Sequence, residues 1–392
     1  MRIKVTFLVI LVNTALTSSL LTPAQLPEDA TLNYSQLGVK YGHKVEEHTV
    51  VTEDGYILTV FRMPGKKKTP VFLMHGTGDT SDCYIIRGNK SLAISLANEG
   101  YDVWAGNGRG NYYSRRHVKL NPDTDPSYWN FSFHDRGYYD LPAMIDYILQ
   151  ATGEKSLQSI GFSQGTTNHF VLLSSKPEYN NKLKVFIALA PIAYLHNLIP
   201  PVSIIGEIGP ILNQLIPSNV NRILDIKSFE RSIIEIVCTQ EAISDLFCVT
   251  LGVLPASGFD PKRLESSFLP TLFSHFPAVF SRKDLIHHNQ LILNKRFMNY
   301  DYGPEENMKR YGFVVPPEYD LRKVTAKIAM FFGNSDNLSR PRDVEYLRTL
   351  LPNVIEHHLM KEKEWSHFDF IYGNDMPETL FPYIFPILEK YS

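Results

Sequence analysis

A serine stands between two glycines in the segment GFSQG at residues 161–165, which is centred on Ser163. The segment follows an apolar run at 157–160 and precedes a stretch, 166–174, that is typical of a helix. Flanking glycines allow the tight turn from strand to helix that lifts a serine side chain out of a sheet. The same turn puts the next amide at a helix N-terminus, where it can stabilise an oxyanion. The segment therefore predicts a nucleophilic serine, although so short a pattern recurs by chance in roughly one chain in ten of this length.

A nucleophilic serine needs a base, and the base needs a carboxylate that orients it. Asp336 directly follows the apolar strand predicted at 328–332, where its side chain can reach a histidine. Asp343 is a competing carboxylate, but we interpret it as the N-cap of a helix at 344–351. Asp336 is therefore the predicted orienting residue.

His367 is the predicted base. The sequence contains 13 histidines, but this one lies in a loop between a strand predicted at 354–359 and the last helical stretch. His357 and His358 lie inside that strand instead. The chain order serine, aspartate, histidine, with each residue at a strand end, is the order of the α/β-hydrolases.

An oxyanion formed at the serine requires two amide donors. One is the backbone N–H of Gln164, which the turn itself supplies. The second should come from the loop after the apolar strand predicted at 70–74, and residues 75–78 of that loop read His-Gly-Thr-Gly. We expect the N–H of Thr77 to be this donor, with Gly76 as the competing residue.

Alternating elements position these residues. Strands and helices alternate between about 70 and 190, which predicts a parallel sheet with helices on both faces. A hairpin is expected at 47–61, before this region. The alternation stops at 191 and returns after 318. We therefore expect an α/β-hydrolase core at 20–190 and 319–392, with an inserted, mainly helical segment at 191–318.

The N-terminus has the form of a signal peptide. Arg2 and Lys4 precede an apolar run at 5–16, and small residues follow at 17–19. The run is too short and too soon polar to span a membrane, and no second segment is long enough to do so. We expect residues 1–19 to be removed, and the protein to be secreted or carried to a lysosome.

Sequons agree with that route. Asn33, Asn89 and Asn130 each begin an Asn-x-Ser segment and are predicted to be glycosylated. A fourth sequon, at Asn337, directly follows Asp336, where a glycan would crowd the site. We expect Asn337 to be unmodified.

Three cysteines occur in the chain. Cys238 and Cys248 are close in sequence and could form a disulfide in an oxidising compartment, which would leave Cys83 free. The absence of Cys-x-x-Cys spacing argues against a zinc site. A net charge of −2 with 44% hydrophobic residues indicates a globular chain without the basic face that nucleic acid requires.

Together these motifs resemble the acid lipase family, which includes gastric and lysosomal acid lipases and many insect lipases. The resemblance runs in family order from about residue 30 to 385. Its main segments are TEDGYIL at 52–58, GYDVW at 100–104, GNGRGN at 106–111, FSFH at 131–134, YDLPA at 139–143, GFSQGT at 161–166, GNSD at 333–336 and HFDF at 367–370.

The resemblance implies a lipid-ester hydrolase, acting on triacylglycerols or cholesteryl esters at an interface or membrane surface through an acyl-enzyme, without metal or cofactor. It assigns Ser163 as nucleophile, His367 as base and Asp336 as its partner, with Thr77 and Gln164 as oxyanion donors. It also implies that the inserted segment is a cap, and that a lid lies near 220–254 in the apolar, helical stretch that contains both cap cysteines.

Two other functions remain open. A carboxylesterase acting on soluble esters would use the same residues and differ in its response to a lipid interface. A lipid carrier that has lost catalysis would be expected to lack the serine or the histidine, and here both are present.

Overall fold

The structure is a computed structural model. It describes residues 26–225, 263–360 and 364–392, together with 234, 237–239, 248 and 258. The predicted signal peptide and most of the predicted lid lie outside the described residues.

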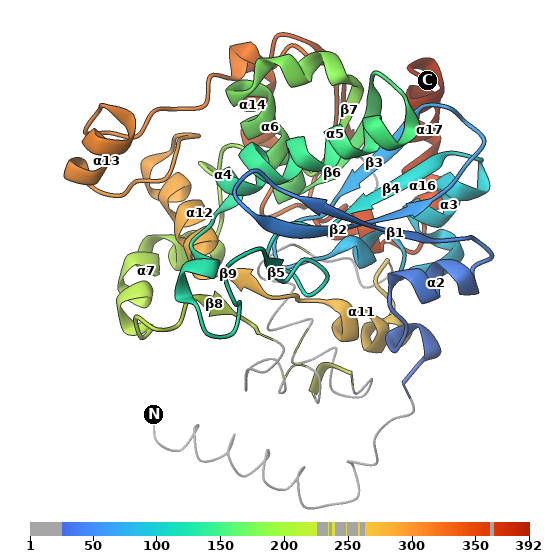
Figure 1. Ribbon diagram of the computed structural model, residues 1–392, viewed down its shortest axis with the longest axis horizontal. Coiled ribbons are helices and arrows are strands. Elements are labelled where there is room, and N and C mark those ends of the chain that lie inside the picture. Colours follow the sequence, from blue (N-terminus) through green and yellow to red (C-terminus); the bar gives the residue numbers. More distant parts are fainter. Residues whose placement is uncertain are drawn as a thin grey trace, which may run out of the picture.

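A nine-stranded sheet forms the centre of the molecule (Figure 1). From one edge to the other the strands are β1 (Glu46–Val51), β2 (Tyr56–Met63), β4 (Asp102–Gly106), β3 (Pro70–Met74), β6 (Leu157–Phe162), β7 (Leu183–Leu189), β10 (Ile328–Gly333) and β11 (Val354–Met360), with β5 (Arg116–His117) paired to β2. The six strands from β4 to β11 are parallel, whereas β1 and β2 form an antiparallel hairpin that joins β4.

Helices cover both faces of the sheet, so its central strands are buried throughout. Successive residues of β3 contribute to opposite cores, because side chains alternate along a strand. Helices α3 (Leu92–Asn98) and α17 (Phe381–Lys390) pack in one core. Helices α5 (Leu141–Thr152), α6 (Gln164–Ser175) and α14 (Pro341–Leu350) pack in the other.

The predicted hairpin and strands form as expected, but the interpretation of Asp343 is wrong. Helix α14 begins at Pro341 and its N-cap is Arg340, so Asp343 lies in the first turn. Proline is favoured at the first helical position, because a backbone N–H at that position would have no partner within the helix. The Asp343 carboxylate instead accepts hydrogen bonds from the backbone N–H groups of His196 and Asn197, in the loop after β7.

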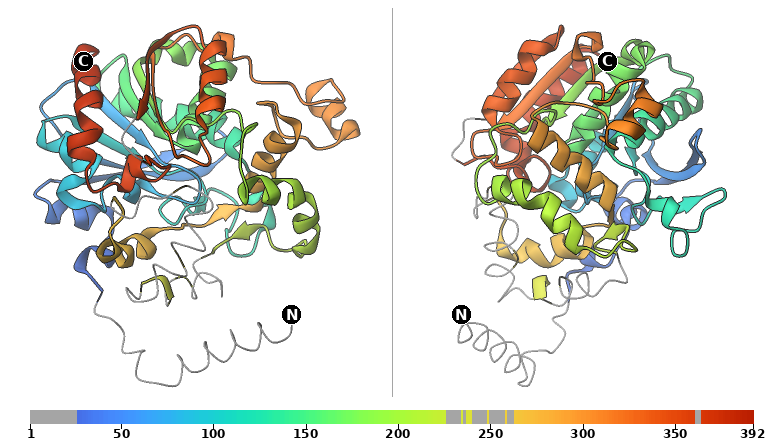
Figure 2. Two further views of the ribbon diagram at one scale, coloured as in Figure 1. Left: turned by 180° about the vertical axis from the view of Figure 1, so that it is seen from behind. Right: turned by 90° about the vertical axis from the view of Figure 1, so that its left-hand side faces the viewer.

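The segment between β7 and β10 lies beside the sheet (Figure 1 and Figure 2). Its two flanking strands pair directly with each other. The described elements of this segment are α7 (Val202–Leu215), β8 (Arg222–Ile223), α11 (Leu269–His275), β9 (Phe280–Ser281), α12 (Arg282–Asn294) and α13 (Pro304–Tyr311). At the start of the predicted lid, strand β8 replaces the expected helix because it pairs with β9. Within the described part of the chain, no helix is long and apolar enough to cross a membrane.

Candidate active site

Ser163 lies in a sharp turn between β6 and α6. Its backbone has φ 52° and ψ −122°, a conformation that non-glycine residues rarely adopt. The turn leaves no room at its glycines: a Cβ on Gly165 would lie 2.3 Å from the Met74 carbonyl oxygen, and one on Gly161 3.0 Å from the Gly165 carbonyl carbon. The two glycines therefore permit the strained turn that presents the serine hydroxyl.

The three residues predicted from separate strand ends meet at this turn. His367 Nε2 lies 2.8 Å from Ser163 Oγ, and His367 Nδ1 lies 2.8 Å from Asp336 Oδ2. His367 and Asp336 are almost completely buried, whereas Ser163 is partly exposed. This arrangement lets the imidazole take the serine proton at one nitrogen while the carboxylate accepts a hydrogen bond from the other.

Backbone groups hold Asp336 in place. Its Oδ1 accepts hydrogen bonds from the N–H groups of Leu338 at 2.8 Å and Ser339 at 2.7 Å. The Ser339 hydroxyl in turn donates to the Pro191 carbonyl, just after β7. Because one carboxylate oxygen is held by the loop, the other is directed to His367.

The loop after β3 lies against Ser163. A Cβ on Gly76 would lie 3.1 Å from the Ser163 Cβ. His75 Nε2 accepts a hydrogen bond from the Gly108 N–H at 3.1 Å, so the proton is on Nδ1, which donates to the Gly76 carbonyl at 2.7 Å. Carbonyl and N–H point in opposite directions across a trans peptide, so the Thr77 N–H points away from His75.

His75 is suited to hold this loop in one protonation state. Burial, together with the positive charge of Arg136, lowers the pKa of His75 to about 3. The imidazole therefore remains neutral, with Nδ1 donating, under mildly acidic as well as neutral conditions. Among the described residues, no group accepts a hydrogen bond from the N–H of Thr77 or of Gln164, which leaves both amides available to an oxyanion.

A buried network surrounds the side chain of Gln164. Arg136 Nη1 donates to Gln164 Oε1 at 2.6 Å and to Asp284 Oδ2 at 3.1 Å. Gln164 Nε2 donates to both oxygens of Asp284, at 2.8 and 2.7 Å. The Arg136 and Asp284 side chains are 2% and 0% exposed. Since Asp284 belongs to α12, the inserted segment contacts Gln164, the residue that follows Ser163.

Sequence reasoning missed Arg136, Asp284 and the role of His75. Arg136 stands in a short π-helix, η5 (Arg136–Asp140), and is separated from Asp284 by more than a hundred residues. No local pattern marks such a pair. His75 begins the segment His-Gly-Thr-Gly at 75–78, a pattern that indicates the loop but not the role of the His75 side chain.

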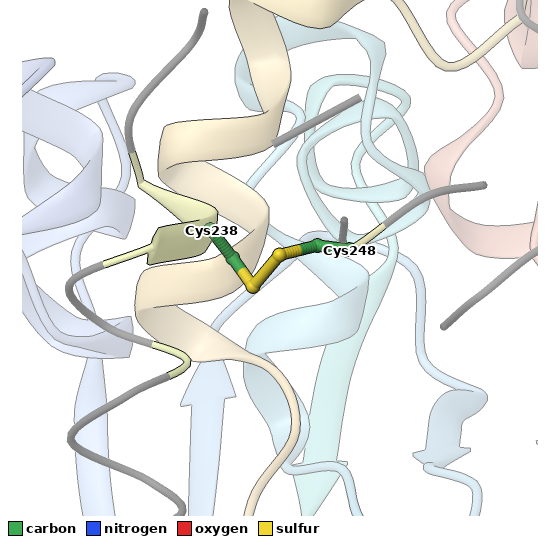
Figure 3. The surroundings of a disulfide bond; sticks show 2 residues. All are labelled: Cys238 and Cys248. Carbon is green, nitrogen blue, oxygen red and sulfur yellow. A yellow bond between two sulfur atoms is a disulfide. The ribbon is translucent and has the colours of Figure 1, made fainter. Parts of the chain in front are cut away.

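The structure joins Cys238 and Cys248 in a disulfide, and Cys83 is a buried free thiol (Figure 3). The side chains at Asn33, Asn89 and Asn130 belong to exposed residues, while Asn337 is half-buried. Glycosylation of the first three remains a prediction. Among the residues that the structure describes, no cluster of His, Cys, Asp and Glu could hold a metal ion.

Two family models match the chain. Residues 34–88 match a partial alpha/beta-hydrolase lipase region, and residues 69–226 match the alpha/beta hydrolase fold. A solved structure from Sulfolobus solfataricus has a TM-score of 0.56 at 14% identity, covering 88% of this chain and 99% of that chain. At this identity the likeness concerns the fold alone.

Curated relatives are similar over most of their length. The chain is 36% identical to Lipase 1 of Drosophila melanogaster over 93% of this chain and 81% of the relative. It is 37% identical to the gastric triacylglycerol lipase of Rattus norvegicus and 36% identical to that of Homo sapiens, in each case over 90% of both chains.

Proposed function

Because the chain belongs to the acid lipase family of the α/β-hydrolase fold, we propose that Ser163, His367 and Asp336 are its catalytic residues and that triacylglycerols or cholesteryl esters are its substrates. The chain is an ester hydrolase, and lipid esters are its substrate class. The observation that carries the residue assignment is the 2.8 Å contact between Ser163 Oγ and His367 Nε2, with Asp336 on the other imidazole nitrogen.

In the first half of the reaction, Ser163 Oγ attacks the ester carbonyl carbon while its proton moves to His367 Nε2. Asp336 accepts the hydrogen bond from Nδ1 and stabilises the imidazolium that forms. The N–H groups of Thr77 and Gln164 stabilise the carbonyl oxygen as it gains negative charge. When the tetrahedral intermediate collapses, His367 returns the proton to the departing alcohol, and the acyl group remains on Ser163.

In the second half, water attacks the acyl carbon and His367 takes its proton. Collapse of the second tetrahedral intermediate breaks the bond to Ser163 Oγ, which recovers the proton from His367. The products are a free fatty acid and the alcohol released earlier. No group beyond the protein and water enters this sequence.

The finer substrate and the location are part of the proposal. Triacylglycerol is the preferred candidate because the gastric relatives named for it align over 90% of their length. The predicted signal peptide at 1–19 and the Cys238–Cys248 disulfide support passage through an oxidising secretory pathway, to the outside or to a lysosome.

Replacing the nucleophile tests the residue assignment. Ser163→Ala should lower kcat on emulsified tributyrin by roughly 10,000-fold or more, because the covalent step is lost while the fold is kept. Thermal unfolding should stay within a few degrees of the wild type, or rise, because the strained turn remains and only a hydroxyl is removed. Substantial hydrolysis by a folded Ser163→Ala variant would exclude Ser163 as the nucleophile.

A carboxylesterase acting on soluble esters is the alternative. Rates measured with one short-chain ester, below and above its solubility limit, separate the two functions. A lipase should gain activity when droplets form, whereas a soluble-ester hydrolase should saturate before that point.

A further inference from the structure

Helix α7 exposes an aliphatic surface to solvent. We call this surface the α7 stripe, and its members and exposed fractions are Ile204 50%, Ile205 54%, Ile208 40%, Ile211 61%, Leu212 40% and Leu215 74%. These positions recur at the spacing that places residues on one side of a helix. The helix lies at the outer side of the inserted segment (Figure 1 and Figure 2).

The side of α7 that packs against the protein carries small and polar residues. A Cβ on Gly206 would lie 2.8 Å from Ile292 Cγ2, and one on Gly209 would lie 2.4 Å from Asn289 Nδ2. Both neighbours belong to α12, so the two glycines let the helices approach closely. The usual arrangement of a surface helix, with its apolar side inward, is reversed here.

Polar contacts fix this orientation. Pro210 has no N–H, so it cannot donate to the carbonyl of Gly206 one turn earlier. Asn289 Nδ2 from α12 donates to that carbonyl instead, at 2.5 Å. At the other end, the Arg282 guanidinium donates to the Asn213 side chain at 2.8 Å and to the carbonyl of Pro217 at 2.8 Å. A rotation that buried the stripe would break these bonds.

We propose that the α7 stripe is a docking surface for an uncharged lipid surface, one of zwitterionic or neutral lipids. Six large aliphatic side chains facing water on one short helix are unfavourable unless a partner covers them, and each stabilises the complex when it leaves water. This inference rests on the proposed function, since a lipid-ester substrate presents such a surface.

The composition of α7 favours lipid over a protein partner. Protein interfaces concentrate binding energy in tryptophan, tyrosine and arginine, and the helix contains none of the three. Its single charged residue is Glu207, with no lysine or arginine. Helices that bind anionic membranes carry lysine and arginine on their polar side. Helix α7 is therefore suited to an uncharged surface.

The stripe is also connected to the proposed catalytic residues. Helix α12 contacts α7 through Asn289 and contacts Gln164 through Asp284. One helix thus separates the docking surface from the residue after the nucleophile. Helix α13 lies on the same side of the molecule (Figure 1 and Figure 2), and Phe313, Val314 and Val315, which come after its C-cap Gly312, are also exposed.

Vesicle binding by the full chain tests the proposal. The probe is a phosphatidylcholine vesicle with a small fraction of triolein, used with the Ser163→Ala background so that hydrolysis does not alter the lipid. Adding Ile208→Glu and Ile211→Glu should lower the partition constant at least about tenfold, because two aliphatic groups are lost and two charges enter the interface. Replacing part of the phosphatidylcholine by phosphatidylserine should not increase wild-type binding.

The matched control places the same two charges elsewhere. Val39→Glu with Val51→Glu changes residues that are 65% and 54% exposed on α2 (Tyr34–Lys40) and β1, and it should leave vesicle binding unchanged. With Ser163 present, the α7 variant should keep the wild-type rate on a dissolved short-chain ester and lose rate on an emulsion. The loss of hydrolysis of both the dissolved and the emulsified ester in Ser163→Ala tests the proposed function. Vesicle binding tests the α7 stripe separately.

Three results would overturn the proposal. The first is unchanged vesicle binding by the α7 variant. The second is equal loss in the control variant. The third is a lipid-free wild-type dimer in sedimentation equilibrium that the α7 variant dissociates, which would make the stripe a protein interface. If the glutamate variant does not fold, Ile208→Ser with Ile211→Ser provides the same comparison without added charge.

Discussion

Among the described residues, two ion pairs with both partners buried join the inserted segment to the sheet domain, and they differ in the nature of the cation and in which part supplies it. At α12 the carboxylate is Asp284 of the segment and the cation is Arg136 of the core, with 3.1 Å between them. At α11 the cation is His275 of the segment, and the carboxylate is Asp82 of the core, at 2.8 Å. We call these the α12 contact and the α11 contact.

The α11 contact requires a charged imidazole. His275 Nδ1 faces the Asp82 carboxylate, and Nε2 faces the backbone carbonyl of Asp29 at 2.9 Å. Both partners are acceptors, so both ring nitrogens must carry protons for both bonds to form. Burial alone would lower the pKa of His275, but the hydrogen bond and charge of Asp82, with the Asp29 carbonyl, raise it above its ordinary value.

Because the two cations titrate differently, pH acts differently on the two contacts. An arginine guanidinium stays charged at every pH a protein experiences, so Arg136 keeps its charge at the α12 contact. An imidazole loses its charge near neutral pH or above, so the α11 contact weakens as pH rises. The α12 contact therefore does not weaken through loss of charge on its cation. The α11 contact is strongest at acidic pH, where His275 is charged.

Breaking the α12 contact should destabilise the protein more than breaking the α11 contact. Asp284→Asn should lower the free energy of unfolding by about 3 to 5 kcal/mol, because it leaves the buried Arg136 without a compensating charge. Activity on a dissolved ester should fall as well, since the Gln164 side chain, next to Ser163, loses an acceptor. Urea unfolding at pH 5 and pH 8 measures the first effect, which should be similar at both values.

The matched control is the same substitution in an exposed pair. Asp320 accepts from Arg322 at 2.8 Å, and that arginine is 85% exposed. Asp320→Asn should cause no measurable change in stability, because solvent screens such pairs. An Asp284→Asn variant as stable as the wild type would show that the α12 contact does not hold the segment.

The two contacts also mark how far the sequence could predict the site. Ser163, Asp336 and His367 each follow a strand, and parallel strands bring their ends to one edge of a sheet, so local patterns can predict that these three residues lie close together. Arg136 and Asp284 meet only because α12 packs over the turn. Tertiary packing decides which buried charges pair, and sequence periodicity does not predict such a pair.

The surface of α7 shows a second limit. Its sequence has an aliphatic side and a small, polar side, but the pattern does not say which side faces the protein. An apolar side is expected to be buried. In α7 the apolar side is exposed instead. The two glycines let α12 approach closely, and Asn289 of α12 donates to the Gly206 carbonyl, which Pro210 leaves without a helical donor.

The smaller expected effect belongs to the α11 contact and depends on pH. His275→Gln should lower the free energy of unfolding by about 1 to 3 kcal/mol at pH 5, because a neutral amide replaces a cation bonded to a buried carboxylate. The raised pKa of His275 fixes the sign. Its contribution is fully present below the unfolded value of about 6.5 and is lost as pH rises through the folded value.

The difference between wild type and His275→Gln should therefore shrink as pH rises from 5 to 9. The other histidines titrate in both proteins, including His75 with its lowered pKa, so their contributions cancel in this difference. Urea unfolding of both proteins at several pH values gives the curve. A difference that stays constant with pH, or grows as pH rises, would contradict a charged imidazole at the α11 contact. It would also remove the distinction between the two contacts, because a neutral His275 would leave one buried nitrogen facing an acceptor at every pH.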